Sequence, residues 1–231
     1  MIEVRHLVKR FGPKVVLRNL EFRASPGEFV ALLGPNGSGK TTFLRILASL
    51  SRPSLGTVIV SGFSLPGEAA AVRSQLGVVS HQPLLYGDLS AEENLRFYGR
   101  LYGVSNLTGQ IDKVLDLVGL KGRRSDRVRT FSRGMQQRLA IGRAVIHDPE
   151  VILFDEPYTG LDQEASEMLD AVLQQVATRG RTILMTSHDL LHTSTMASRF
   201  DVLFHGAITA SITASELPTN NLLQFYREAL H

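Results

Sequence analysis

A glycine-rich run followed by a lysine is the first feature of this sequence that could do chemistry. Residues 34–41 read Gly-Pro-Asn-Gly-Ser-Gly-Lys-Thr and match the pattern Gly-x-x-x-x-Gly-Lys-Ser/Thr at every fixed position. Glycines let the backbone bend tightly and turn its N–H groups toward phosphate oxygens. The helix expected to follow would point its positive end at the same anion. We therefore predict a nucleotide phosphate site formed by Gly34, Pro35, Asn36, Gly37, Ser38, Gly39, Lys40, Thr41 and Thr42.

Three side chains of this loop have distinct expected tasks. Lys40 would reach the β- and γ-phosphates, and the Thr41 hydroxyl would ligate Mg²⁺. Thr42 would contact an inner phosphate. The alternative is a glycine-rich turn that binds nothing, but the flanking strand and helix favour the phosphate site. The loop alone leaves kinases, GTPases and ATPases open.

Two adjacent acids form the second candidate site. A buried strand is predicted over residues 151–154, and Asp155 and Glu156 follow it directly. The carboxyl ends of the strands are where open α/β sheets bind ligands. Asp155 suits a contact to Mg²⁺, commonly through water, and Glu156 suits polarising an attacking water. A pair of solvated acids at a strand end is the alternative interpretation.

Alternating strands and helices would position both sites. Strands are expected at 2–8, 15–22, 28–33, 58–60, 76–80, 151–154 and 182–187, with a closing hairpin of 201–204 and 207–213. Helices are expected at 40–50, 68–75, 90–102, 111–117, 132–147, 162–179 and 222–230. The alternation predicts an α/β fold with a largely parallel sheet. The predominantly helical stretch from about residue 83 to residue 119 reads as an insertion into that core, which resumes after Ser132.

The composition excludes several classes of protein. The 231 residues contain 43% apolar and 20% charged residues, as in ordinary globular domains, and Cys is absent, which removes disulfides and thiolate chemistry. A net charge of +3 is too mild to indicate nucleic acid, and no nucleic-acid partner is expected. No apolar run approaches the roughly 20 residues of a membrane span, and the first residues show no signal core. We expect a chain that does not cross a membrane but can dock on a protein that does.

A third segment brings in a resemblance to a known family. Residues 131–138, Phe-Ser-Arg-Gly-Met-Gln-Gln-Arg, resemble the signature motif of ABC ATPases in its LSxGMxQR form. With the phosphate loop, Asp155-Glu156, the segment 158–162 and Ser187-His188-Asp189, the order resembles an ABC nucleotide-binding domain over nearly the whole chain. The resemblance implies one domain, 1–231, with a P-loop NTPase core (about 1–82 and 140–231). It also implies a mostly parallel sheet, an N-terminal antiparallel β part and a helical subdomain (about 83–139).

The resemblance also implies roles for five further residues. Phe11 would stack on adenine, although a lone aromatic is equally often a core residue. Ser132 and Gly134 would touch the γ-phosphate across a dimer interface, and Ser132 would also cap a helix. Asp162 would link the two sites of the dimer, or serve as an ordinary helix N-cap. His188 would contact the γ-phosphate.

The sequence departs from the family pattern in two places. The signature has Phe131, Arg133 and Met135 where Leu, Gly and Gln are usual. The family usually has Gln directly after the segment that corresponds here to residues 77–80, but His81 follows it and Gln82 comes one residue later. Either His81 or Gln82 could therefore fill the Mg²⁺-sensing position.

The implied function is that of the ATP-binding and ATP-hydrolysing subunit of a transporter. ATP and Mg²⁺ would be its cofactors, and it would form a homodimer or heterodimer on an integral membrane permease at the cytoplasmic face of the membrane. The aromatics around residues 86–102 lie where the family docks that permease. His81-Gln-Pro and residues 93–98 resemble the ATPase of haem exporters of cytochrome c maturation, which implies export of haem or another small hydrophobic molecule. A multidrug-type exporter ATPase, a soluble non-transport ABC ATPase and a small-molecule kinase are the alternatives.

Overall fold

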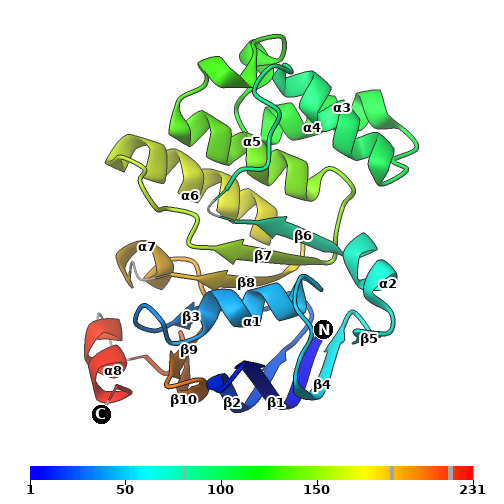
Figure 1. Cartoon of the computed structure of the whole chain (residues 1–231). Helices are drawn as coiled ribbons and strands as arrows, with labels where there is room; N and C mark the ends of the chain where they lie inside the picture. The colour runs from blue at the N-terminus through cyan, green and yellow to red at the C-terminus, as the bar shows by residue number, and fades with distance from the viewer. Residues whose placement is uncertain (81, 188–189, 218–220, 231) are drawn as a thin grey trace.

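A six-stranded sheet forms the centre of the molecule (Figure 1). The computed structural model describes residues 1–80, 82–187, 190–217 and 221–230. The sheet order is β10-β9-β3-β8-β7-β6. Its strands are β3 (Phe29–Leu33), β6 (Leu76–Val79), β7 (Val151–Asp155), β8 (Thr182–Thr186), β9 (Arg199–Phe204) and β10 (Ala207–Thr213). All neighbouring pairs are parallel except β9 and β10, which form the predicted hairpin.

A second, antiparallel sheet lies beside the first and has the order β2-β1-β4-β5. It is built from β1 (Ile2–Phe11), β2 (Lys14–Ala24), β4 (Leu55–Val60) and β5 (Phe63–Leu65). Alternate residues of β1 and β2 are buried, as expected for strands that cover a core on one face. This sheet confirms the expected N-terminal antiparallel part, but β5 was not predicted because it is only three residues long.

The central strand β3 separates two apolar cores. All five of its residues are buried. Val30 and Leu32 pack into the core shared with the antiparallel sheet and α1 (Lys40–Leu47), whereas Phe29, Ala31 and Leu33 pack into the core on the other face. Because successive side chains of a strand point to opposite faces, a continuous apolar run is what a strand covered on both sides requires.

Between β6 and β7 the described residues form only helical elements. They are α3 (Ala91–Leu101), α4 (Leu107–Leu117), η1 (Lys121–Arg123), η2 (Val128–Thr130) and α5 (Arg133–Val145). These helices gather at the end of the molecule next to β6, away from the antiparallel sheet (Figure 1). α3 begins with the predicted capping box, in which Ser90 and Glu93 each bond the other's backbone N–H.

The remaining helices are α2 (Ala69–Ser74), α6 (Gln163–Ala177), α7 (Leu190–Ser194) and α8 (Leu222–Glu228). α6 covers β7 on the side of the helical segment (Figure 1). The prediction that the first helix reaches residue 50 was wrong. α1 ends at Leu47 because Ser49 adopts a left-handed backbone with φ 58°, which ends the regular hydrogen-bond pattern.

Candidate active site

The glycine-rich loop connects β3 to α1 and packs tightly against two other strands. Gly39 precedes α1 with φ 116°, and a Cβ atom there would lie 2.7 Å from Leu17 Cδ2 of β2. A Cβ atom on Gly34 would lie 2.3 Å from the Leu203 carbonyl oxygen of β9. Only glycine fits at either position. Gly39 has a positive φ that other residues rarely adopt, and at Gly34 the Leu203 carbonyl oxygen leaves no room for a Cβ atom.

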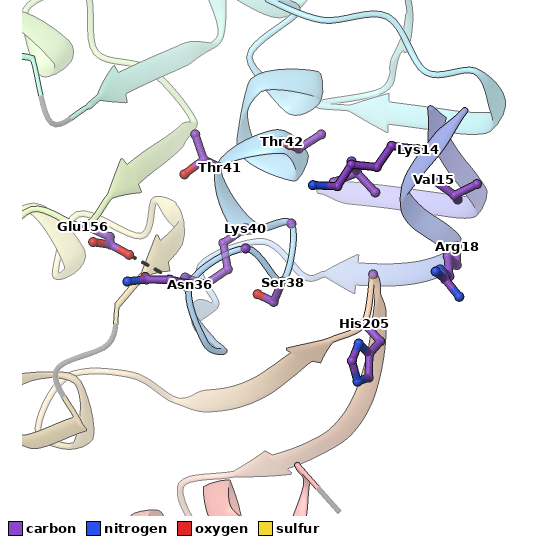
Figure 2. A pocket seen from close by; sticks show the side chains of 14 residues that line it. Lys14, Val15, Arg18, Asn36, Ser38, Lys40, Thr41, Thr42, Glu156 and His205 are labelled. Atoms are coloured by element: carbon purple, nitrogen blue, oxygen red, sulfur yellow. Dashed lines mark ion pairs between the residues drawn. The ribbon is translucent and has the colours of Figure 1, made fainter. Parts of the chain in front are cut away.

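A pocket of about 360 Å³ opens over this loop (Figure 2). One wall comes from the loop and the start of α1, another from β2, a third from the turn between β9 and β10, and Glu156 faces the loop from the end of β7. The lining residues are Lys14, Val15, Val16, Arg18, Asn36, Gly37, Ser38, Gly39, Lys40, Thr41, Thr42, Glu156, His205 and Gly206.

Lys40 is buried at the base of the loop. Its Nζ donates to the carbonyl oxygens of Gly34 at 2.7 Å and Pro35 at 3.2 Å. Glu156 Oε1 lies 3.8 Å from the same nitrogen (Figure 2). Burial lowers the pKa of the Lys40 ammonium group, while the carboxylates of Glu156 and Asp155 act against that shift. An anion bound in the pocket would stabilise the charged ammonium in the same way.

Asp155 is held by two hydroxyl groups. Thr41 Oγ1 donates to Asp155 Oδ1 at 3.2 Å, and Thr186 Oγ1 of β8 donates to the same oxygen at 2.8 Å. The parallel pairing of β7 with β8 places Asp155 opposite Thr186. The predicted metal ligands Thr41 and Asp155 are therefore brought together at the edge of the sheet.

Glu156 follows β7 in an unusual backbone conformation, with φ 51°. Its N–H group donates to Thr186 O at 3.2 Å and to Thr186 Oγ1 at 3.1 Å. Thr159 Oγ1 donates to Glu156 Oε2 at 3.4 Å. The Glu156 carboxylate points toward Lys40 (Figure 2).

One buried hydroxyl in the pocket lacks a hydrogen bond. Ser38 Oγ is buried and has no partner among the described residues. A buried polar atom without a partner is unfavourable unless a ligand or water satisfies it. Ser38 therefore fits a pocket that takes up a ligand rich in oxygen acceptors.

Other predicted site residues lie outside the lining of this pocket. Phe11 is 53% exposed and lies under Lys9 Nζ, 4.7 Å from the ring centroid, so it is not a core residue. Gln82 is also exposed. His81 and His188 fall outside the described residues, so the structure does not place them.

The signature segment and Asp162 also lie outside the pocket lining, and both serve as helix caps. Ser132 Oγ accepts the Met135 N–H at 3.3 Å, which confirms the predicted cap, and Asp162 Oδ1 accepts the Ala165 N–H at 2.8 Å. Ser132 and Asp162 are both exposed. A Cβ atom on Gly134 would lie 2.7 Å from Ala165 Cβ, so this glycine lets α5 approach α6 closely.

Sequence reasoning missed the pocket walls formed by β2 and by the β9–β10 turn. Lys14, Val16 and Arg18 come from β2, and His205 and Gly206 come from the turn. Arg18 N–H donates to Gly206 O at 2.8 Å, which joins the two walls. The hairpin itself was predicted, but no local sequence signal indicates that its turn would dock beside the phosphate loop.

The comparison with known protein families decides among the phosphate-binding classes. The sequence model described as "ABC transporter" matches residues 17–159. The chain belongs to the ABC transporter family. The match covers the phosphate loop, the signature segment and Asp155-Glu156, and the domain is an ABC-type ATPase.

Relatives with known names support this assignment. The chain is 36% identical to the Nod factor export ATP-binding protein I of Cupriavidus metallidurans over 94% of its own length and 72% of that protein. It is 33% identical to the linearmycin resistance ATP-binding protein LnrL of Bacillus subtilis, over 94% of the chain and 70% of that protein. It is 38% identical to the ABC transporter ATP-binding protein NatA of Bacillus subtilis, over 90% of each.

Solved structures show the same fold. One, titled as the ATP binding subunit of an ABC transporter, superimposes with a TM-score of 0.88 at 29% identity and covers 99% of each chain. A dimeric, post-hydrolysis ATP-binding cassette bound to ADP and Pi superimposes with a TM-score of 0.82 at 26% identity, over 93% of this chain and 99% of that one. In the described part of the chain, no helix combines the length and apolar character of a membrane span.

Proposed function

We propose that this ABC ATPase binds Mg·ATP in the pocket over the phosphate loop, hydrolyses it, and powers export through a separate membrane permease. The observation that carries the proposal is the facing arrangement of Lys40 and Glu156, with Nζ and Oε1 3.8 Å apart in a pocket built on the phosphate loop. A cation for phosphate and a carboxylate for water thus lie next to each other in the lining of one pocket. The loop glycines Gly34, Gly37 and Gly39, with Pro35, Asn36, Ser38 and Thr42, would surround the phosphates.

Thr41 and Asp155 would hold the Mg²⁺ ion. A hydroxyl and a carboxylate oxygen 3.2 Å apart are the hard oxygen donors that this ion prefers. When bound, the ion neutralises charge on the phosphate oxygens. Gln82, or His81 in its place, would sense the ion. Because Gln82 lies outside the pocket lining, that contact requires it to move toward the phosphate loop.

Glu156 would orient the attacking water. Hydrolysis of the γ-phosphate depends mainly on positioning and charge neutralisation, so a single well-placed carboxylate can have a large effect. His188 would contact the γ-phosphate, as its place after β8 implies. Phe11 would stack on the adenine ring, since its exposed face is available to a planar ligand.

Two such domains would enclose ATP between them. Ser132 and Asp162 are exposed and absent from the lining of their own pocket, as expected for groups that act on the site of a second domain. Ser132 and Gly134 would meet the γ-phosphate of the partner, and Asp162 would connect the two sites. The dimeric state of a solved relative supports this arrangement, and the second domain is either a copy or a related chain.

The permease would dock on an aromatic surface beside α3, which would place the domain at the cytoplasmic face of the membrane. Tyr86, Phe97 and Tyr102 are 50%, 42% and 40% exposed. The rings of Tyr86 and Phe97 meet edge to face at 5.1 Å. Exposed apolar side chains grouped in this way are typical of a protein interface. We define these three residues as the aromatic surface.

The proposed cargo is a small hydrophobic molecule. Two of the relatives reported above are named for Nod factor export and linearmycin resistance, which supports export of a small molecule and does not single out haem. Haem export of the cytochrome c maturation type is therefore the narrower form of the proposal, and a multidrug-type exporter is its alternative.

ATP binding is tested with Lys40→Ala. The variant should lose at least about 100-fold in ATP affinity, because the phosphate charge would face no buried cation. Lys113→Ala, an exposed lysine of α4, is the matched control and should bind as wild type. Isothermal titration with ATP in excess Mg²⁺ measures both. Equal affinity of Lys40→Ala and wild type would remove Lys40 from the site.

The permease interface is tested by co-purification from mildly solubilised membranes. Wild type should recover an integral membrane subunit, and Phe97→Asp should lose it, because a charge in an apolar interface is costly to bury. Leu55→Asp places the same charge on β4, where Leu55 is 62% exposed, and should retain the subunit. Recovery of soluble partners alone would favour a non-transport ABC ATPase.

A further inference from the structure

A tyrosine, an aspartate and a histidine from three separate segments of the chain meet close to the proposed catalytic carboxylate. Tyr158 comes two residues after Glu156, Asp170 lies on α6, and His192 lies on α7. Tyr158 Oη donates to Asp170 Oδ1 at 2.6 Å, and His192 Nδ1 lies 2.9 Å from Asp170 Oδ2. The tyrosine and imidazole rings stack with centroids 4.7 Å apart and planes at 15°. Each carboxylate oxygen therefore engages a different segment.

The three side chains are largely shielded from water. Tyr158 is 8% exposed, and the side chains of Asp170 and His192 are 23% and 19% exposed. A shielded carboxylate is favourable only when its oxygens are hydrogen-bonded, as both are here. Polar groups in such a place specify one arrangement of the surrounding segments more strictly than apolar packing does.

The segment that this cluster holds contains a strained residue. Glu156 has φ 51°, a conformation that is strained for a non-glycine residue and persists only when the surroundings maintain it. On one side, Thr186 maintains it through two hydrogen bonds to the Glu156 N–H. On the other side, the Thr159 N–H donates to Glu156 O at 3.2 Å, and Tyr158 is fixed by Asp170.

The same carboxylate reaches the segment beyond β8. α7 begins at Leu190, two residues after His188, and His192 of this helix is the second partner of Asp170. We infer that Asp170 is a positioning residue for ATP hydrolysis, which holds the turn of Glu156 and the start of α7 in a fixed relation through Tyr158 and His192. This inference rests on the proposed function, because it gives Asp170 a task only if Glu156 acts on water.

The test compares Asp170→Leu, which replaces both acceptor oxygens by methyl groups, with Asp170→Asn, which keeps an acceptor for the tyrosine hydroxyl. For Asp170→Leu, kcat for ATP should fall about tenfold while KM for ATP stays within about twofold. Asp170→Asn should recover most of the loss. Tyr158→Phe should lower kcat and leave KM unchanged. Adding it to Asp170→Leu should lower kcat little further, because both substitutions remove the hydrogen bond between Tyr158 and Asp170. Glu167→Gln removes an exposed carboxylate from the same helix and serves as the control.

Amide hydrogen exchange of the full chain without nucleotide separates positioning from activity. In Asp170→Leu, the Glu156 and Thr159 amides should exchange about tenfold faster than in wild type and in Glu167→Gln. Unchanged exchange at these amides would overturn the inference, and so would faster exchange with unchanged kcat. A parallel fall of kcat, ATP affinity and thermal midpoint would show a merely structural contact and also overturn it. If wild type hydrolyses no ATP, the proposed function fails, while the exchange comparison still decides whether Asp170 holds the turn.

Discussion

At the residue scale, the site is a small set of charges arranged around one buried lysine. Lys40 Nζ contacts two loop carbonyls and faces Glu156, and Asp155 accepts hydrogen bonds from the hydroxyls of Thr41 and Thr186. Asp155 and Glu156 are adjacent in sequence, yet their carboxylates have different partners, and Glu156 has a left-handed backbone. Neighbouring acids with separate partners can serve metal and water at the same time.

Glu156→Gln separates ATP binding from hydrolysis. The variant should bind ATP with affinity close to wild type, because Lys40 and the loop are intact, but its turnover should fall about 10²-fold or more, since an amide is a poor acceptor for the proton of water. It should also accumulate a dimer in the presence of ATP, measured by size-exclusion chromatography with light scattering.

The control for this prediction is Glu150→Gln, an exposed acid just before β7. It should keep wild-type turnover and show no nucleotide-dependent dimer. Wild-type turnover in Glu156→Gln would contradict the water-orienting role.

At the element scale, the pocket depends on how the β9–β10 turn docks on β2. Gly206 has φ 85°, and a Cβ atom on it would lie 2.4 Å from the Val16 carbonyl oxygen. Since Val16 lines the pocket and Arg18 N–H donates to Gly206 O, the turn and the strand form one wall. The left-handed backbone of the turn favours glycine, and the close approach to β2 leaves no room for a Cβ atom.

Gly206→Ala and Gly62→Ala form a matched pair that tests this docking. Gly62 has φ 84°, but a Cβ atom there would meet nothing within 4 Å. Both substitutions introduce left-handed strain of about 1–2 kcal/mol. Gly206→Ala should lower the free energy of unfolding by about 1–3 kcal/mol more, because the turn must also move away from β2. Urea denaturation at neutral pH measures the difference, and equal losses would contradict the docking argument.

At the scale of the whole molecule, two cores share one sheet, and the helical segment covers its β6 end. His147 follows α5 there and stacks on Tyr102, with ring centroids 3.8 Å apart and planes at 5°. Burial lowers the pKa of His147 from 6.5 to about 4, and the charges of Arg143 and Arg181 act in the same direction. Folding therefore favours the neutral imidazole.

This shift makes the global stability depend on pH. Above pH 6.5 the imidazole is neutral in both states and contributes no pH dependence. Between pH 6.5 and 4 the unfolded chain takes up the proton and the folded chain does not, so stability falls with falling pH by up to about 3 kcal/mol. His147→Phe keeps a ring against Tyr102 and removes the titration.

The free energy of unfolding of wild type and His147→Phe, measured by denaturant from pH 7 to 4, checks this prediction. As the pH falls, the free energy of unfolding of wild type should decrease relative to that of His147→Phe. A constant difference across this range would show that His147 is not held neutral.

Local patterns in the sequence predicted much of the site. The Ser132 and Asp162 caps and the closing hairpin depend on contacts within a few residues, and the structure confirms these elements. Backbone geometry and capping act over such short ranges, so residue type and spacing were enough to predict them.

Only the tertiary structure decided the rest. Two features join segments that are far apart in the sequence and that no local pattern connects. They are the pocket walls from β2 and the β9–β10 turn, and the contacts among Tyr158, Asp170 and His192. Such contacts depend on strand order and on how helices pack on the sheet. The sequence by itself determined which groups are available for phosphate chemistry. The packing of two cores on one sheet decided which of them face each other, because the burial of apolar surface drives that packing and acts without regard to distance along the chain.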